Sequence, residues 1–161
     1  MSAGTGPPSP SAAWARAGLV FACVLIADQA VKALVTSALQ RGEVRGIVGG
    51  VKLVNVRNSG VAFGQLQDGG AIVGAVIAVA VLALLVYFAR NGSRPWIWLP
   101  TGLVLGGAVG NVVDRLREGA VVDFLKLPHW PAFNVADSAI TIGVIVLLLV
   151  MERGDGSRRP A

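Results

Sequence analysis

Apolar residues fill four long stretches of this chain, and polar segments separate them. The stretches cover residues 14–37, 71–89, 96–113 and 133–151. Each is close to the roughly 20 residues that a helix needs to cross the hydrocarbon of a bilayer. A transmembrane barrel would instead show alternating segments of about ten residues. The pattern therefore predicts an all-α polytopic membrane protein with four transmembrane helices.

The segments around these stretches delimit one membrane domain, residues 14–151. Residues 1–13 are rich in Ser, Pro, Gly and Ala and are expected to form a disordered tail. Residues 152–161 form a polar, basic tail. Residues 51–57 alternate apolar and polar side chains, which is typical of a β-strand. Residues 116–132, before the fourth stretch, are expected to be irregular.

The charges in the short connections predict an orientation. Four crossings place both termini on one side of the membrane. The loop between the second and third stretches, which carries Arg90 and Arg94, lies on that side too. Short cytoplasmic loops are enriched in Arg and Lys, so both termini are expected in the cytoplasm.

Composition agrees with a chain whose solvent is mostly lipid. The chain is 54% hydrophobic and 14% charged, with a mean hydropathy of +0.67, whereas a soluble domain carries about 25% charged residues. The net charge of +5 could suggest a nucleic-acid partner. The basic residues are scattered, however, and form no patch interleaved with aromatic residues, so no nucleic acid is expected.

The available chemistry is narrow. The chain has one cysteine and one histidine, which excludes an intrachain disulfide and a zinc site of the usual Cys/His type. We therefore expect no metal and no cofactor. A Ser-His-Asp enzyme would need His129 as its base. Carboxylates are stronger candidates, because two that share a site cannot both ionise cheaply. The ionised member can activate water while the protonated member donates to a carbonyl oxygen.

Polar side chains collect where three of the predicted helices reach the side opposite the termini. An ionisable group at membrane depth is costly unless it is paired or wetted, so such groups mark a candidate functional site. Asp28 and Lys32 lie one helical turn apart and can pair. The whole set is Asp28, Gln29, Lys32, Asn111, Asp114, Arg115, Asn134 and Asp137, with Asp123 between the third and fourth helices. Gly102, Gly106, Gly107 and Gly110 would let the third helix pack closely against its neighbours.

Two other functions fit a polar cluster in a membrane protein. A small transporter or channel subunit would place polar residues along the full depth of its helices, whereas here they gather at one end. A membrane scaffold without enzymatic activity would use the polar groups only to hold helices together. In a scaffold, removal of one carboxylate would destabilise the fold without stopping a reaction.

Five segments, in order along the chain, resemble those of the bacterial lipoprotein signal peptidases (signal peptidase II). They are residues 28–32 (Asp-Gln-Ala-Val-Lys), 58–64 (Asn-Ser-Gly-Val-Ala-Phe-Gly), 107–115 (Gly-Ala-Val-Gly-Asn-Val-Val-Asp-Arg), 121–124 (Val-Val-Asp-Phe) and 133–138 (Phe-Asn-Val-Ala-Asp-Ser). The resemblance implies an aspartic endopeptidase of the bacterial cytoplasmic membrane with its active site on the outer side. We expect it to be monomeric. It further implies a small extracytoplasmic β-sheet cradle and a short amphipathic helix between the first two spans.

The resemblance also implies a substrate and a site. The substrate would be a diacylglyceryl-modified prolipoprotein, cleaved just before the lipid-bearing cysteine, and globomycin-type cyclic peptides would inhibit the enzyme. The catalytic dyad would be Asp123 and Asp137. Residues that bind substrate or support the dyad would be Asp28, Lys32, Asn58, Gly60, Gly107, Asn111, Arg115, Asn134 and Ala136.

Asp114 is the chief rival for a place in the dyad, since it shares a helix face with Asn111. Its neighbour Arg115 is expected to form an ion pair with it, which would keep Asp114 ionised and make it a poor acid. The segment between Asp123 and Asp137 is short and contains Pro128 and Pro131, so the loop there is expected to be trimmed.

Overall fold

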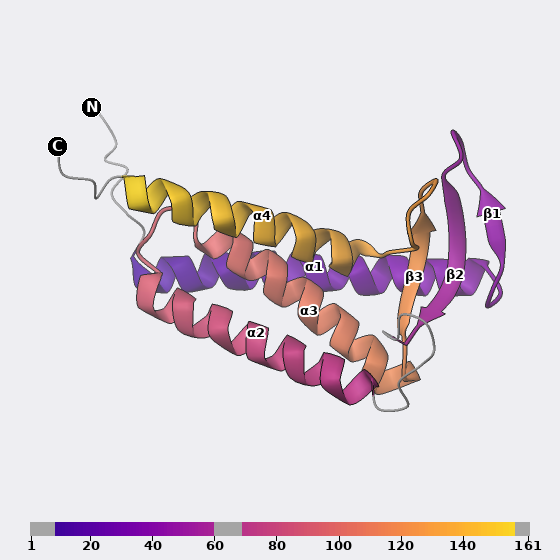
Figure 1. Ribbon diagram of the computed structural model, residues 1–161, viewed down its shortest axis with the longest axis horizontal. Coiled ribbons are helices and arrows are strands. Elements are labelled where there is room, and N and C mark those ends of the chain that lie inside the picture. The colour runs from indigo at the N-terminus through magenta and orange to yellow at the C-terminus, as the bar shows by residue number, and fades with distance from the viewer. Residues whose placement is uncertain (1–8, 60–68, 157–161) are drawn as a thin grey trace.

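Four helices lie side by side and a small sheet closes one end of the bundle (Figure 1). The computed structural model describes residues 9–59 and 69–156. The helices are α1 (Pro10–Ala38), α2 (Gly69–Asn91), α3 (Trp98–Glu118) and α4 (Val135–Gly156), and the strands are β1 (Val44–Gly46), β2 (Lys52–Asn58) and β3 (Val121–Lys126). The start of α1 and the end of α4 lie together, at the end of the bundle opposite the sheet (Figure 1).

Within the described residues, three helical segments are long and apolar enough to cross a membrane. They are Pro10–Ala38, Gly74–Asn91 and Val135–Arg153. The third predicted span, α3, is not among them. It continues to Glu118 instead of ending near residue 113, so it includes charged residues that the sequence pattern had placed in an irregular segment. One of them, Asp114, is buried inside the bundle.

The first helix begins earlier than its hydropathy suggested. Ser9 caps it, because the Ser9 hydroxyl oxygen accepts a hydrogen bond from the Ala12 amide at 3.3 Å. Pro10 occupies the first turn, where its missing N–H costs nothing. The predicted disordered tail was therefore too long, since residues 10–13 are helical and Ala13 is fully buried.

The sheet is antiparallel with the strand order β1-β2-β3. The strand predicted at residues 51–57 is confirmed as β2, whereas β3 lies in the segment predicted to be irregular. β-branched and aromatic residues surround Asp123 in β3, and such residues favour strands. Between α1 and α2, the described residues 39–59 contain β1 and β2. No helix lies within the described residues 39–59, and residues 60–68 lie outside the described residues, so the predicted amphipathic helix stays a prediction.

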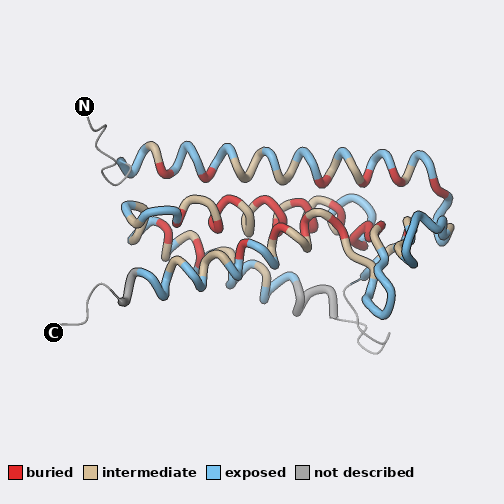
Figure 2. Tube along the Cα trace, turned by 90° about the horizontal axis from the view of Figure 1, so that it is seen from above, coloured by how far each residue is buried: buried red, intermediate tan, exposed pale blue. Residues whose placement is uncertain are grey.

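Glycines let α3 approach α1 and α4 closely, as predicted. A Cβ atom at Gly106 would lie 2.8 Å from the Val24 Cβ, and one at Gly102 would lie 2.7 Å from the Val20 Cβ. Gly107 faces the backbone of Ala136 at the start of α4. Figure 2 shows that the outer faces of the helices are largely exposed and that buried residues gather between them.

We expect Gly107→Ala to destabilise the fold. Its Cβ would meet the Ala136 carbonyl oxygen and lie 2.8 Å from the Ile140 Cγ1, and such overpacking costs about 1–3 kcal/mol. Gly18→Ala on α1 is the matched control, because its Cβ would meet nothing within 4 Å. The control should gain about 0.5–1 kcal/mol from helix propensity. Thermal unfolding in detergent measures both, and equal stability of the two variants would contradict the packing argument.

Candidate active site

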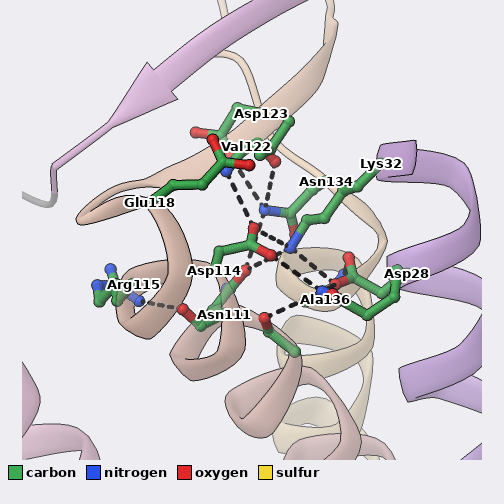
Figure 3. Close-up of polar contacts among 12 residues, drawn as sticks. Asp28, Lys32, Asn111, Asp114, Arg115, Glu118, Val122, Asp123, Asn134 and Ala136 are labelled. Atoms are coloured by element: carbon green, nitrogen blue, oxygen red, sulfur yellow. Dashed lines mark hydrogen bonds and ion pairs between the residues drawn. The ribbon is translucent and has the colours of Figure 1, made fainter. Parts of the chain in front are cut away.

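Two carboxylates from different elements meet at one asparagine. Asp123 lies on β3 and Asp137 lies in the first turn of α4. The Asn134 Nδ2 donates to the Asp123 Oδ1 at 2.8 Å, and the Asn134 Oδ1 accepts from the Asp137 amide at 2.8 Å. Figure 3 shows Asp123 above Asn134 within one network of polar contacts. Asn134 thus bridges the two members of the predicted dyad.

The position of Asp137 follows from the way α4 begins. Asn134 precedes the helix and caps it, and the Asp137 Oδ2 accepts in return from the Asn134 amide at 3.3 Å. This reciprocal pair is a capping box with aspartate at its third position. The Asn111 Nδ2 donates to the other oxygen of Asp137 at 2.8 Å. Both carboxylate oxygens of Asp137 are therefore held by backbone and side-chain donors.

Asn111 joins the dyad to a second polar cluster. Its Oδ1 accepts from the Asn134 Nδ2 and from the Lys32 Nζ, both at 3.1 Å. Lys32 also forms ion pairs of 2.7 Å with Asp28 and with Asp114. All three ionised side chains are buried. The predicted pairing of Asp28 with Lys32 is confirmed.

The two carboxylates that flank Lys32 also hold backbone groups near the dyad. The Asp28 Oδ1 accepts from the Ala136 amide at 2.9 Å, and the Asp114 Oδ2 accepts from the Val122 amide at 3.0 Å. Asp28 therefore fixes the start of α4, and Asp114 fixes β3 one residue before Asp123. The predicted ion pair of Asp114 with Arg115 was wrong, because consecutive residues on a helix point in different directions and Lys32 takes that place.

Two further residues of the sequence motifs, Asn58 and Arg115, lie near the site, but only Asn58 bonds to a member of the predicted dyad. The Asn58 Nδ2 at the end of β2 donates to the Asp123 Oδ2 at 2.9 Å. Arg115 donates to the Asn111 carbonyl oxygen at 3.2 Å, and Figure 3 shows its guanidinium pointing away from Asp123. Gly60, another predicted site residue, lies outside the described residues.

One member of the polar network, Gln29, was among the polar residues predicted at this face but was not assigned to the dyad, to its support or to substrate binding. Its Nε2 donates to the Asp114 Oδ1 at 2.9 Å and to the Gly110 carbonyl oxygen at 3.3 Å. The sequence feature that could have assigned it to the site is its place beside Asp28 in the first motif. Gln29 completes the set of donors that surrounds Asp114.

Burial and charge favour the protonated form of Asp123. Its side chain is 1% exposed, and burial raises its pKa from the ordinary 3.8 to about 6. The hydrogen bonds from Asn58 and Asn134 act in the opposite direction, whereas the negative charge of Asp137 raises the pKa further. Asp123 can thus exchange a proton close to neutral pH.

We expect the stability of the protein to fall as the pH rises from about 4 to about 7 because of this residue. An acid whose pKa is raised by folding binds its proton more tightly in the folded state, so its contribution is complete below the unfolded pKa and is lost through the folded pKa. The shift from 3.8 to about 6 corresponds to about 3 kcal/mol. Unfolding measured against pH should show this slope, and Asp123→Asn should remove it. An unchanged slope in the variant would contradict the assignment.

The comparisons with known proteins agree on one family. A family profile described as signal peptidase (SPase) II matches residues 20–153. The chain is 41% identical over 146 residues to the lipoprotein signal peptidase of Moorella thermoacetica, covering 88% of this chain and 97% of that protein. It is 44% identical over 135 residues to the lipoprotein signal peptidase of Brevibacillus brevis, covering 81% and 91%.

Solved structures have the same fold. One bacterial membrane enzyme, determined by the in meso method at 2.3 Å resolution, has a TM-score of 0.79 and 26% identity and covers 90% of this chain and 92% of its own. A second, determined at 1.9 Å by the same method, has a TM-score of 0.77 and 28% identity, with 84% and 91% covered. The profile spans most of the domain that contains the polar network. The chain therefore belongs to the signal peptidase II family and is a membrane peptidase.

Proposed function

We propose that the chain is an aspartic endopeptidase that removes the signal peptide from diacylglyceryl-modified prolipoproteins, cleaving just before the lipid-bearing cysteine. The relatives reported above are lipoprotein signal peptidases. The observation that carries the proposed chemistry is the Asn134 bridge. The Asn134 side chain bonds both to the buried Asp123 and to the half-buried Asp137, and so holds the two residues close together. The negative charge of Asp137 is one of the causes that raise the pKa of Asp123.

The two aspartates differ in a way that suggests separate roles. Asp137 is half-buried, so it can reach a water molecule and take its proton as that water attacks the scissile carbonyl. Asp123 is buried with a raised pKa, so it can hold a proton for the carbonyl oxygen. No covalent intermediate is required. Asn58, Asn111 and Asn134 orient the carboxylates through the hydrogen bonds described above.

The other buried carboxylates are less suited to this chemistry. Lys32 neutralises Asp28 and Asp114 at 2.7 Å, and a backbone amide donates to each of them. The oxygens of both carboxylates are thus already engaged by a lysine and by backbone amides. These two residues are therefore assigned to positioning β3 and α4.

The lipid part of the substrate has a candidate place beside α3. A groove of about 430 Å³ between α2 and α3 is lined by apolar side chains that include Ile77, Val81 and Val112, with Arg115 at its edge. The Arg115 Nε is buried and, among the described residues, has no hydrogen-bond partner. A buried unpaired donor costs about 1–3 kcal/mol. Binding of a substrate ester carbonyl by this group would recover that cost.

We further propose that α3 is the fourth crossing. Its 21 residues span about 30 Å, which matches the hydrocarbon thickness. Its charged residues lie at its sheet end, where they would meet the membrane surface. Both termini and the connection with Arg90 and Arg94 would then face the cytoplasm, and the sheet and dyad would face outward across the bacterial cytoplasmic membrane. The enzyme would act as a monomer.

Purified protein in detergent tests the proposal directly. It is incubated with a prolipoprotein that carries diacylglyceryl-cysteine and, separately, with the same chain lacking the lipid. We expect a gel shift and a mass that places the lipid-bearing cysteine at the new N-terminus, from the lipidated substrate alone. A globomycin-type cyclic peptide should block the reaction. Equal cleavage of both chains, or cleavage at another bond, would refute the substrate assignment.

A further inference from the structure

Two loops meet at one end of the sheet and expose apolar side chains together. The turn between β1 and β2 contains Ile47 and Val48, and the loop after β3 contains Leu127, Pro128 and Trp130; we call these five residues the sheet tip. A Cβ atom on Gly50, in the first loop, would lie 3.0 Å from the Pro128 Cγ in the second. The Trp130 amide donates to the Leu127 carbonyl oxygen at 3.2 Å and closes the second loop. The two loops therefore form one continuous surface.

This surface is unusually apolar for side chains so fully exposed. Val48 is 75% exposed, Trp130 63% and Ile47 60%. Scattered apolar residues on a surface need no explanation, but a contiguous group marks an interaction site. Contact with water alone is therefore unfavourable for the side chains of the sheet tip.

Positive charge accompanies the apolar group. Lys52 begins β2 and Lys126 ends β3, and the two are direct cross-strand partners at this end of the sheet. Like charges in such a pair are destabilising. Within residues 9–59 and 69–156, neither lysine forms an ion pair. An anionic surface outside the chain would relieve the repulsion.

The direction of the strands places the sheet tip over lipid. Figure 1 shows the strands crossing the helix axes, with the loops that form the sheet tip projecting sideways past α4. If the helices cross the bilayer, the sheet tip overhangs the membrane surface beside α4 and not the polar network inside the bundle. Tryptophan is enriched at the interface between membrane and water, and basic residues are attracted to anionic headgroups there.

We propose that the sheet tip is a lipid anchor, in which Ile47, Val48 and Trp130 enter the headgroup region beside α4 and Lys52 and Lys126 bind anionic phospholipid headgroups. The anchor would hold the sheet, and with it Asn58 and Asp123, at a fixed height above the hydrocarbon. This inference depends on the membrane architecture and not on the chemistry of the dyad.

Fluorescence of Trp130 tests the anchor. Trp14, Trp96 and Trp98 are replaced by Phe, circular dichroism checks the fold, and the protein is reconstituted in vesicles of phosphatidylcholine and phosphatidylglycerol. We expect blue-shifted emission, quenching by brominated lipid and loss of quenching by aqueous iodide. If this variant does not fold, an environment-sensitive dye on Val48→Cys, in a Cys23→Ala background, gives the same measurement. Emission and iodide quenching typical of tryptophan in water would overturn the proposal.

Charge reversal tests the choice of lipid. Brominated phosphatidylglycerol should quench Trp130 more than brominated phosphatidylcholine at equal mole fraction, with about a fivefold preference for each lysine that faces the surface. Lys52→Glu/Lys126→Glu keeps a like-charge pair but reverses its sign, so it should abolish this preference. Arg153→Glu, at the opposite end of the bundle, should leave it unchanged. Equal quenching by both lipids in the unmodified protein, or Val48→Cys cross-links between copies in place of lipid contact, would overturn the assignment.

Discussion

Asp123→Asn and Asp137→Asn are each expected to abolish cleavage of lipidated prolipoprotein while the protein still inserts and folds. Loss of a general acid or base from a peptidase lowers kcat/KM by about 10²- to 10⁴-fold. The two residues share Asn134, and the proposed mechanism needs one carboxyl group to take a proton from water and the other to donate one to the carbonyl oxygen, so loss of either should stop the reaction. Single-turnover cleavage followed by gel shift measures the effect.

The structure gives a reason for these variants to fold. Asparagine has the shape of aspartate and keeps one acceptor oxygen. In Asp137→Asn that oxygen can still accept from the Asn134 amide and preserve the cap of α4. In Asp123→Asn that oxygen can still accept from the Asn134 Nδ2. Asn58 can turn its side-chain amide so that its oxygen accepts from the new NH₂ group at position 123.

Asp114→Asn is the control that separates chemistry from positioning. Its carboxylate holds Lys32 and the Val122 amide, so its loss should lower stability more than it lowers the rate per folded molecule. Activity is therefore compared at equal folded fractions. Full activity of Asp123→Asn together with an inactive Asp114→Asn would show that the dyad is misassigned. If the protein were only a membrane scaffold, all three variants would be less stable and the unmodified protein would not cleave the substrate.

Hydropathy predicted the helices well and failed where polar residues are buried. α1, α2 and α4 agree with the predicted apolar stretches to within a few residues. The end of α3 was missed because hydropathy treats a charge as a sign of water, whereas Asp114 lies inside the bundle against Lys32. A buried ion pair depends on two distant residues, and no local pattern contains both.

The site shows the same division between local and distant information. Spacing correctly paired Asp28 with Lys32, because both lie on one helix. It could not find the partner of Asp114, which lies on another helix, or the strand that carries Asp123. The motifs identified Asn58, Asn111 and Asn134 as site residues but did not predict which groups they bond to. Their hydrogen bonds depend on how β2, α3 and α4 pack, and the glycines of α3 control that packing.

Lys32→Met is expected to cause the largest loss of stability of any single substitution in the network. Lys32 is 4% exposed and forms ion pairs of 2.7 Å with Asp28 and Asp114. Removing one partner of a buried ion pair leaves uncompensated charge and costs about 3–5 kcal/mol. Here two buried carboxylates lose the same cation, and Asn111 loses the donor that orients its Oδ1 toward the dyad. Unfolding in detergent measures the loss.

A second substitution distinguishes unpaired charge from lost packing. Adding Asp114→Asn to Lys32→Met removes one of the two stranded charges, so the double variant should be more stable than the sum of the single effects predicts. Arg16→Met removes a positive charge from an exposed position on the same helix, and its loss of contact with Trp98 should cost at most about 1 kcal/mol. If Lys32→Met costs no more than Arg16→Met, or if the two network substitutions are additive, the buried lysine does not hold the carboxylates as its distances indicate. Because Asp28 and Asp114 anchor the backbone beside Asp137 and Asp123, the same substitution should also displace both side chains of the proposed dyad.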